Sequence, residues 1–189
     1  VAYHLAADPG FKGKVVVIEK DPTYRYSASA LSAASIRQQF SSAVNIRISL
    51  FGIGFLRDIG ARLAVDGEVP AIDLHEGGYL YVASGEGAPV LEANQRLQQV
   101  EGADIALLSA EALGAKFGWL NTSDLACGTY GVSGEGWFDG WALLQAFRRK
   151  ARSLGVEYRQ HADRQALAHG QVVVDAAHAR NAGGRHLER

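Results

Sequence analysis

A glutamate that closes a strand-like apolar run is the first residue that could do chemistry. Glu19 directly follows residues 15–18, which are three valines and an isoleucine. In dinucleotide-binding folds, an acidic side chain at the end of the second strand accepts hydrogen bonds from the adenosine ribose hydroxyls. The glycine-rich turn that accompanies such a residue would lie about 20 residues upstream, which here falls before Val1. The alternative interpretation of Glu19 is a solvated carboxylate at a strand end.

Residues 27–35 form a stretch of serines, alanines and one leucine that leads into Ile36 and Arg37. Its side chains are too small to pack a core, so the stretch either lies close against another molecule or segment or forms an ordinary loop. Arg37 brings a positive charge to the end of this stretch. That charge serves either an anionic partner or a surface salt bridge, and both interpretations stay open.

Metal and disulfide chemistry find no support in the sequence. The histidines are scattered without metal-ligand spacing, and the single cysteine, Cys127, has no neighbouring histidine or cysteine. We therefore expect no metal site, and we expect Cys127 to be a small buried residue. One cysteine also fits a reducing, cytoplasmic setting.

The apolar pattern predicts the elements that position these residues. A helix over residues 1–7 leads into a strand over 15–18, which is the second half of a βαβ unit with a buried parallel strand. Two short antiparallel strands are predicted on either side of Glu76-Gly77-Gly78, and Ser109 and Asp139 are candidate helix N-caps. Helices are predicted over 1–7, about 48–63, 90–100, 109–117 and 140–154, and strands over 15–18, 72–74, 79–82, 125–132, 156–158 and 172–174.

Short motifs follow one another in a fixed order along nearly the whole chain. They are Ala2-Tyr3-His4-Leu5-Ala6, Glu19-Lys20-Asp21-Pro22, Ile36-Arg37-Gln38-Gln39-Phe40, Gly78-Tyr79-Leu80, Gly134-Glu135-Gly136-Trp137-Phe138-Asp139, Gly155-Val156 and Asn181-Ala182-Gly183. This ordered set resembles the D-amino-acid oxidase/sarcosine oxidase family of FAD-dependent oxidoreductases, which includes glycine oxidase-like enzymes. Each motif is weak alone, and the resemblance rests on their order and spacing.

The resemblance implies an FAD site. Glu19 would hold the adenosine ribose, and the stretch 27–35 would pass along the pyrophosphate and flavin, where small side chains let backbone N–H groups approach. Ile36 and Arg37 would lie near the flavin ring, where a cation could stabilise a reduced, anionic flavin. The implied cofactor-binding residues are Glu19, Lys20, Ser27, Ser29, Ser35, Ile36, Arg37, Asn181, Ala182 and Gly183.

The resemblance also implies the fold class and the reaction. We expect an α/β fold with an incomplete Rossmann-like parallel sheet that binds FAD and part of an antiparallel-sheet substrate domain. Residues 1–70 and 134–189 would belong to the FAD-binding domain, and residues 71–133 to the substrate domain. The enzyme would oxidise the C–N bond of an amino acid or of a secondary or N-methyl amine, and its electrons would pass to oxygen or another acceptor. The resemblance assigns no catalytic residue.

Composition limits the partners. The 189 residues carry 19 basic and 20 acidic side chains, a net charge of -1, without a block of like charge, so we expect neither nucleic acid nor a membrane surface as partner. No apolar run approaches the roughly 18 residues of a membrane-spanning helix. The chain contains no methionine, and we expect it to be a fragment that lacks the family's glycine-rich turn and its C-terminal part. It also has Gly140 where the family usually has proline, and a short segment over 164–178 replaces a longer meander.

Two other functions remain open from the sequence. The chain could be a truncated, non-catalytic remnant that does not bind FAD by itself, because the phosphate-binding helix N-terminus would be missing. An NAD-dependent dehydrogenase would instead show regular alternation of strands and helices after Glu19. The stretch 27–35 and the antiparallel signals over 72–82 argue against that dehydrogenase.

Overall fold

The computed structural model describes residues 1–160 and 171–175. The chain divides into two compact units, each assembled from separate stretches of sequence. Unit 1 comprises Val1–Ser32, Leu63–Val69 and Trp141–Arg189, and unit 2 comprises Ala33–Arg62 and Pro70–Gly140. The predicted assignment of residues 1–70 and 134–189 to FAD and of 71–133 to substrate is a functional division, and it stays a prediction.

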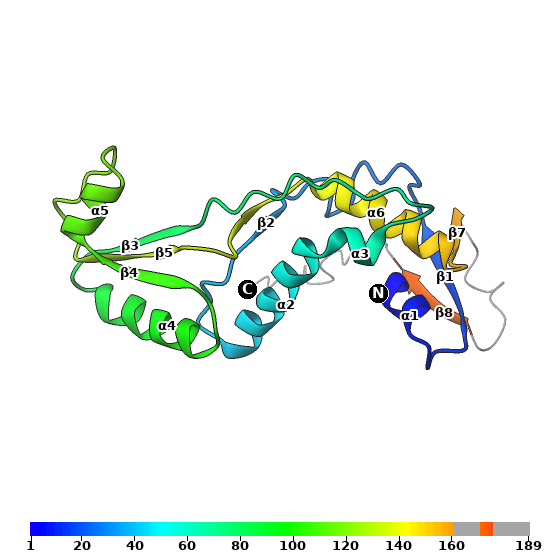
Figure 1. The fold of residues 1–189 in the computed structure, drawn as a ribbon, viewed down its shortest axis with the longest axis horizontal. Helices are drawn as coiled ribbons and strands as arrows, with labels where there is room; N and C mark the ends of the chain where they lie inside the picture. Colours follow the sequence, from blue (N-terminus) through cyan, green and yellow to red (C-terminus); the bar gives the residue numbers. More distant parts are fainter. Residues whose placement is uncertain (161–170, 176–189) are drawn as a thin grey trace, which may run out of the picture. The chain divides into compact units, whose positions relative to one another are not determined.

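Unit 1 is built on a three-stranded parallel sheet. The strand β1 (Lys14–Glu19) lies in the middle, between β7 (Glu157–Gln160) and β8 (Gln171–Asp175) (Figure 1). The valines at positions 15–17 are buried, because a central parallel strand is covered on both faces. The structure confirms the predicted strand over 15–18 and its parallel neighbours.

Two helices complete the core of unit 1. Ala2 from α1 (Ala2–Ala7) and Ala151 from α6 (Gly140–Ser153) are buried in one cluster with Val15 and Val17 of β1. Gly155 follows α6 in the left-handed region at φ 86°, as the sequence predicts for a residue that ends a helix. The predicted helices over 1–7 and 140–154 are therefore confirmed.

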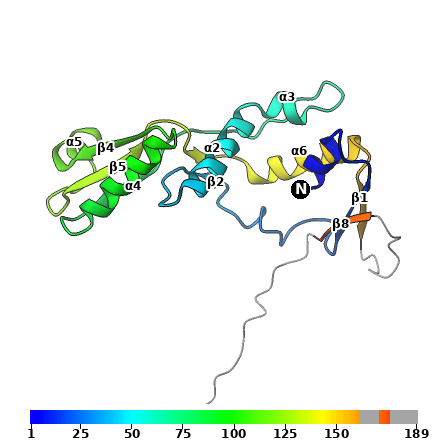
Figure 2. The ribbon, with the colours of Figure 1, turned by 90° about the horizontal axis from the view of Figure 1, so that it is seen from below.

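The elements of unit 2 are β2 (Ser35–Ile36), α2 (Ala43–Arg57), β3 (Leu80–Ala83), α4 (Ala88–Val100), β4 (Ile105–Ser109), α5 (Ala110–Lys116), β5 (Cys127–Gly131) and β6 (Gly136–Trp137), and α3 (Ile59–Leu63) follows α2. Three of the strands form an antiparallel sheet in the order β3-β5-β4. The helix α4 lies along this sheet in both views of the ribbon (Figures 1 and 2), and it contacts β4 and β5. A separate strand pair, β2 with β6, holds the segment that contains Ile36.

The parallel and antiparallel sheets confirm the predicted α/β fold class, but two element predictions were wrong. Residues 72–74 form no strand, and β3 pairs with β5 and not with residues 72–74. Before β3, His75 forms an isolated antiparallel bridge with Trp137. The predicted long helix over 48–63 begins earlier, where the Ser42 hydroxyl accepts the Asn45 N–H, and it is interrupted at Asp58.

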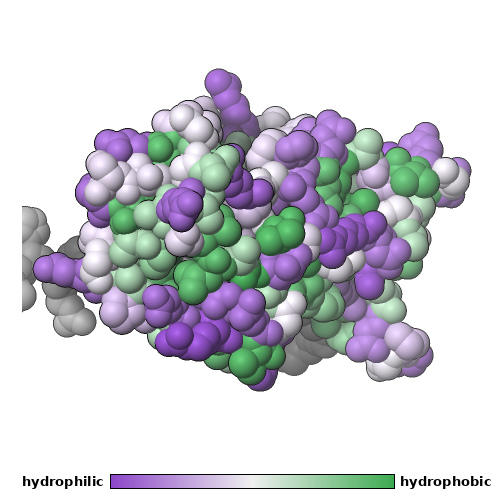
Figure 3. All heavy atoms as spheres, turned by 60° about the vertical axis from the view of Figure 1, so that its left-hand side comes forward, coloured by the Kyte–Doolittle hydropathy of each residue, from purple (hydrophilic) through white to green (hydrophobic). Residues whose placement is uncertain are grey.

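The surface of the molecule mixes polar and apolar side chains. Figure 3 shows hydrophobic side chains (green) in patches between hydrophilic ones (purple) on the face that it displays. On α2, the side chains of Val44, Ile48 and Phe51 are 60–63% exposed at helical spacing, so this helix has an apolar face toward solvent. Within residues 1–160 and 171–175, every helix is too short or too polar to reach across a lipid bilayer.

Candidate functional site

Glu19 stands at the carboxyl end of β1, the central strand of unit 1. Its Oε1 atom accepts the backbone N–H of Asp21 at 2.9 Å, which fixes the carboxylate at the strand end. The chain then turns, because Oδ1 of Asp21 accepts both the N–H and the hydroxyl of Thr23. The Thr23 hydroxyl and N–H hold the pKa of the Asp21 carboxyl below its usual range. Ligands of open α/β sheets bind at this carboxyl edge.

The segment that follows Glu19 is anchored by one aromatic residue. Tyr24 is buried, and the Arg148 guanidinium carbon lies 4.5 Å from the centre of its ring. Burial raises the pKa of the Tyr24 hydroxyl. Lys20, which precedes Tyr24, is exposed. After Tyr24, Ser29 is exposed and Ser27 is half-buried, with its hydroxyl accepting the N–H of Ala30 at 3.2 Å.

The predicted cofactor-binding residues fall into three groups. Unit 1 contains Glu19, Lys20, Ser27 and Ser29, and unit 2 contains Ser35, Ile36 and Arg37. Asn181, Ala182 and Gly183 lie outside the described residues.

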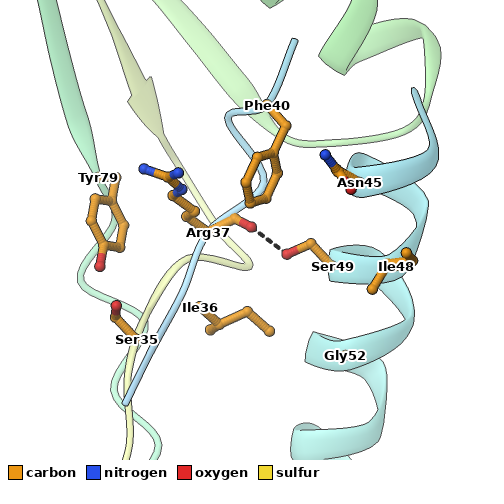
Figure 4. Close-up of a pocket in the computed structure, with 9 residues that line it drawn as sticks. All are labelled: Ser35, Ile36, Arg37, Phe40, Asn45, Ile48, Ser49, Gly52 and Tyr79. Carbon is orange, nitrogen blue, oxygen red and sulfur yellow. Dashed lines mark hydrogen bonds between the residues drawn. The ribbon is translucent and has the colours of Figure 1, made fainter. Parts of the chain in front are cut away.

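The group in unit 2 lines a hollow of about 540 Å³ (Figure 4). Ile36 points toward α2, where a Cβ atom on Gly52 would come within 3.2 Å of the Ile36 Cδ1 atom. Absence of a side chain on Gly52 therefore leaves room for Ile36 beside the helix. The residues that line the hollow are Ser35, Ile36, Arg37, Phe40, Asn45, Ile48, Ser49, Gly52 and Tyr79.

Arg37 brings a positive charge to this hollow. Figure 4 shows its side chain between Tyr79 and Phe40, and the guanidinium carbon lies 4.8 Å from the centre of the Phe40 ring. Its Nη1 atom donates to the Tyr81 hydroxyl at 2.5 Å, and its backbone carbonyl accepts the Ser49 hydroxyl. Among the described residues, no carboxylate forms an ion pair with Arg37, so the salt-bridge interpretation gains no support there.

A fully buried carboxylate lies next to the segment that carries Arg37. Oε1 of Glu135 accepts the backbone N–H groups of Gln38 at 2.5 Å and of Gln39 at 3.0 Å. Oε2 accepts the side-chain amide of Gln39 at 2.8 Å and the backbone N–H of Tyr79 at 3.2 Å. Burying a charged group is costly unless it is hydrogen-bonded, and these donors provide the compensation.

The two glutamines extend this network to the sheet and the neighbouring turn. The Gln39 side chain donates to the Tyr79 carbonyl at 2.9 Å and accepts the hydroxyl of Thr129 on β5 at 2.5 Å. The Gln38 side chain donates to the Gly134 carbonyl at 3.2 Å. Residues 37–39 are therefore held from several directions.

The turn that contains Glu135 is hydrogen-bonded to the ion pair between Arg57 and Glu76. The Glu76 carboxylate accepts two hydrogen bonds from the Arg57 guanidinium, at 2.7 and 2.5 Å, and one from the backbone N–H of Gly134 at 2.6 Å. The hydrogen bonds from Arg57 hold the pKa of Glu76 below its usual range, with a further contribution from the Gly134 N–H. A bidentate pair of arginine and carboxylate fixes the relative orientation of the two side chains in addition to stabilising their charges.

Glu135 is the residue that the sequence reasoning missed. The only signal was the pattern Gly134-Glu135-Gly136, because an acidic residue between two glycines suits a crowded turn. Cys127 is buried as predicted, and burial raises the pKa of its thiol. In the part of the chain that the structure describes, no three His, Cys, Asp or Glu side chains gather in a way that could hold a metal ion.

Known proteins are similar to this chain in sequence. The family profile described as FAD dependent oxidoreductase matches residues 1–186. FAD-dependent oxidoreductase domain-containing protein 1 from Xenopus laevis is 46% identical over 166 residues, which are 86% of this chain and 33% of that protein. Its counterpart from Bos taurus is 42% identical over 178 residues, which are 92% of this chain and 35% of that protein. The chain thus spans about a third of the length of these curated relatives.

Solved structures show the same fold at lower identity. Glycine oxidase from Geobacillus kaustophilus matches with a TM-score of 0.64 and 19% identity, over 85% of this chain and 42% of that one. L-proline dehydrogenase from P. horikoshii matches with a TM-score of 0.63 and 17% identity, over 79% of this chain and 44% of that one. At these identities the likeness concerns the fold alone.

Proposed function

Because the chain belongs to the family of FAD-dependent oxidoreductases, we propose that the full-length protein oxidises the C–N bond of an amino acid or of a secondary or N-methyl amine. The names of several structural neighbours support this substrate class, since they are a glycine oxidase, an L-proline dehydrogenase and an iminodiacetate oxidase. Another neighbour is an L-alpha-glycerophosphate oxidase, whose substrate has no nitrogen.

The observation that carries the cofactor assignment is the position of Glu19. A carboxylate that ends the central strand of a parallel sheet is placed to accept hydrogen bonds from ribose hydroxyls. Its orientation is fixed by the Asp21 N–H at 2.9 Å. The carboxylate acceptor at this edge therefore fits the ribose hydroxyl donors in the adenosine part of FAD, with Lys20 beside it.

The other predicted cofactor-binding residues are proposed to contact the pyrophosphate and the flavin. Ser27, Ser29 and Ser35 would contact the pyrophosphate and flavin, where their small side chains permit close approach of backbone N–H groups. Asn181, Ala182 and Gly183 would also contact the cofactor. When bound, FAD would supply the acceptor for the hydride that leaves the carbon beside the substrate nitrogen.

The hollow gives Arg37 its proposed role. A fixed cation stabilises negative charge that develops near it. The hollow that Arg37 lines has a volume of about 540 Å³, which lies in the range of small-molecule sites. We therefore assign to Arg37 the stabilisation of the reduced cofactor. Ile36 would pack beside the flavin ring.

The substrate class is tested on the full-length protein loaded with FAD. Glycine, N-methylglycine, proline and glycerol 3-phosphate are each added without oxygen, and the absorbance of the oxidised flavin is followed. Loss of absorbance with an amine or amino acid would support the proposal. Loss with glycerol 3-phosphate alone, or with none of the four, would overturn it. Readmission of oxygen then shows whether oxygen itself is the acceptor.

The role of Glu19 is tested by Glu19→Gln in the same protein. A hydrogen bond to a charged group contributes about 1.5–3 kcal/mol, so the Kd for FAD should rise about tenfold or more. Glu86→Gln is the matched control, because Glu86 is an exposed carboxylate in unit 2. Equal affinities of the two variants for FAD would contradict the assignment. The same titration on the 189-residue chain tests the alternative of a remnant that does not bind FAD by itself.

A further inference from the structure

We propose that Glu135 is a positioning residue that fixes the orientation of Arg37, an inference that rests on the proposed function. Glu135 is not among the residues that line the hollow. Its carboxylate instead binds the backbone N–H groups of Gln38 and Gln39, the two residues that follow Arg37. It would act on the cofactor only through the backbone that carries the guanidinium.

The same carboxylate also reaches the other wall of the hollow. Its Oε2 atom accepts the backbone N–H of Tyr79 at 3.2 Å, and Tyr79 lines the hollow opposite Phe40 (Figure 4). One buried group thereby ties two segments of the hollow together, although they are distant in sequence. A buried network with its partners satisfied holds one geometry, because each alternative leaves a polar group without a partner.

Arg37 is also held by hydrogen bonds to α2 and to β3. Its carbonyl accepts the hydroxyl of Ser49 on α2, and its Nη1 atom donates to the hydroxyl of Tyr81 on β3. With Glu135 fixing the next two N–H groups, the backbone of Arg37 is constrained at its carbonyl and immediately after it. Displacement of this backbone by a fraction of an ångström would move the guanidinium relative to any charge in the hollow.

The test uses the full-length protein loaded with FAD and measures the midpoint potential of the flavin. Glu135→Gln keeps the size of the side chain, but whichever way the amide turns, its NH2 group faces N–H donors. Arg37→Gln gives the reference, since loss of a cation near the reduced flavin lowers the potential. We expect Glu135→Gln to lower the potential by most of the shift of Arg37→Gln. The double variant should show no more than the Arg37→Gln shift, because both changes remove the same interaction.

A destabilising control separates positioning from loss of stability. Leu113→Ala removes a fully buried side chain that packs near Gly128. It should lower the Tm by an amount comparable to Glu135→Gln and leave the potential unchanged. If Glu135→Gln does not fold, Glu135→Asp is the milder variant, because it keeps the charge but cannot reach all of the donors.

The outcomes distinguish this inference from the function on which it rests. If Arg37→Gln does not shift the potential, the proposed role of Arg37 fails and the inference fails with it. If Arg37→Gln shifts the potential but the Glu135 variants behave like Leu113→Ala, the proposed function stands and Glu135 is merely structural. Additive shifts in the double variant would likewise overturn the inference.

Discussion

At the scale of single residues, the turn around Glu135 depends on two glycines. A Cβ atom on Gly131 would meet the Glu135 carboxylate, with its Cδ atom only 2.7 Å away. A Cβ atom on Gly136 would meet the His75 carbonyl oxygen and lie 2.9 Å from the Glu76 Cα atom. Neither neighbour can yield easily, because one is fixed by several hydrogen bonds and the other is backbone.

Gly131→Ala should therefore destabilise the protein. Forcing one extra methyl group into a packed site costs about 1–3 kcal/mol, and urea unfolding measures this loss. Gly54→Ala is the matched control, because a Cβ atom at this exposed position of α2 would meet nothing within 4 Å. That control should be more stable than the wild type by about 0.5–1 kcal/mol. Equal stabilities of the two variants would contradict the proposed crowding at Gly131.

The ion pair between Arg57 and Glu76 predicts a dependence of stability on pH. The pKa of Glu76 is lowered in the folded protein, first by its hydrogen bonds with Arg57. A lowered folded-state pKa gives stability that is present above the ordinary carboxyl pKa of about 4.3 and is lost as the pH falls through the folded-state value.

Arg57→Met should remove this contribution. The difference in unfolding free energy between wild type and variant should be constant from neutral pH down to about 5, and it should shrink below about 4.3. Arg96→Met serves as the control, since Arg96 and Glu92 form an exposed pair at 3.9 Å. Urea unfolding at several pH values measures both differences. A difference for Arg57→Met that persists unchanged in acid would refute the assignment.

At the scale of elements, α5 shows how one cap supports a helix that is only seven residues long. The Ser109 hydroxyl accepts the N–H of Ala112 at 3.2 Å, as the sequence predicts for an N-cap. A helix of this length does not form by propensity alone. It therefore depends on this cap and on the burial of Leu113.

Ser109→Ala should cost about 1 kcal/mol of unfolding free energy. Thermal unfolding measures this as a lower Tm. Ser123→Ala is the control, because Ser123 is exposed and uses its backbone N–H, not its hydroxyl, in its hydrogen bond to Asn121. The control should lie within about 0.5 kcal/mol of the wild type. A Tm for Ser109→Ala as high as that of the control would mean that the cap does not hold α5.

The element predictions succeeded where the pattern is local and failed where pairing is distant. The buried valines at 15–17 and the cap at Ser109 carry their own signals, so β1 and α5 were predicted. The hairpin predicted over 72–82 does not form, and β3 pairs instead with β5, where Leu80 lies opposite Tyr130. A contact between positions so far apart in the sequence leaves no trace in the local alternation of residues.

At the scale of the whole molecule, ordered motifs predicted the family and the apolar run over 15–18 predicted a parallel strand, but neither predicted the interior of the site. Glu19 and Arg37 were singled out by their residue type and position, and the family resemblance then implied their roles. Glu135 was not, because its importance comes from donors on Gln38, Gln39 and Tyr79, which meet only in the folded unit 2. Burial of a charged side chain is a property of the assembled structure, and composition does not predict it.

The parallel sheet of unit 1 has a consequence for synthesis on the ribosome. Val16 pairs with Glu157 and with Val173, so β1 leaves the exit tunnel long before either neighbour exists. Translation of the roughly 140 intervening residues takes on the order of ten seconds. All of unit 2 emerges within that interval. The nascent chain can therefore complete unit 2 before β7 and β8 exist to pair with β1, and a strand edge that lacks its partner is a natural target for chaperones.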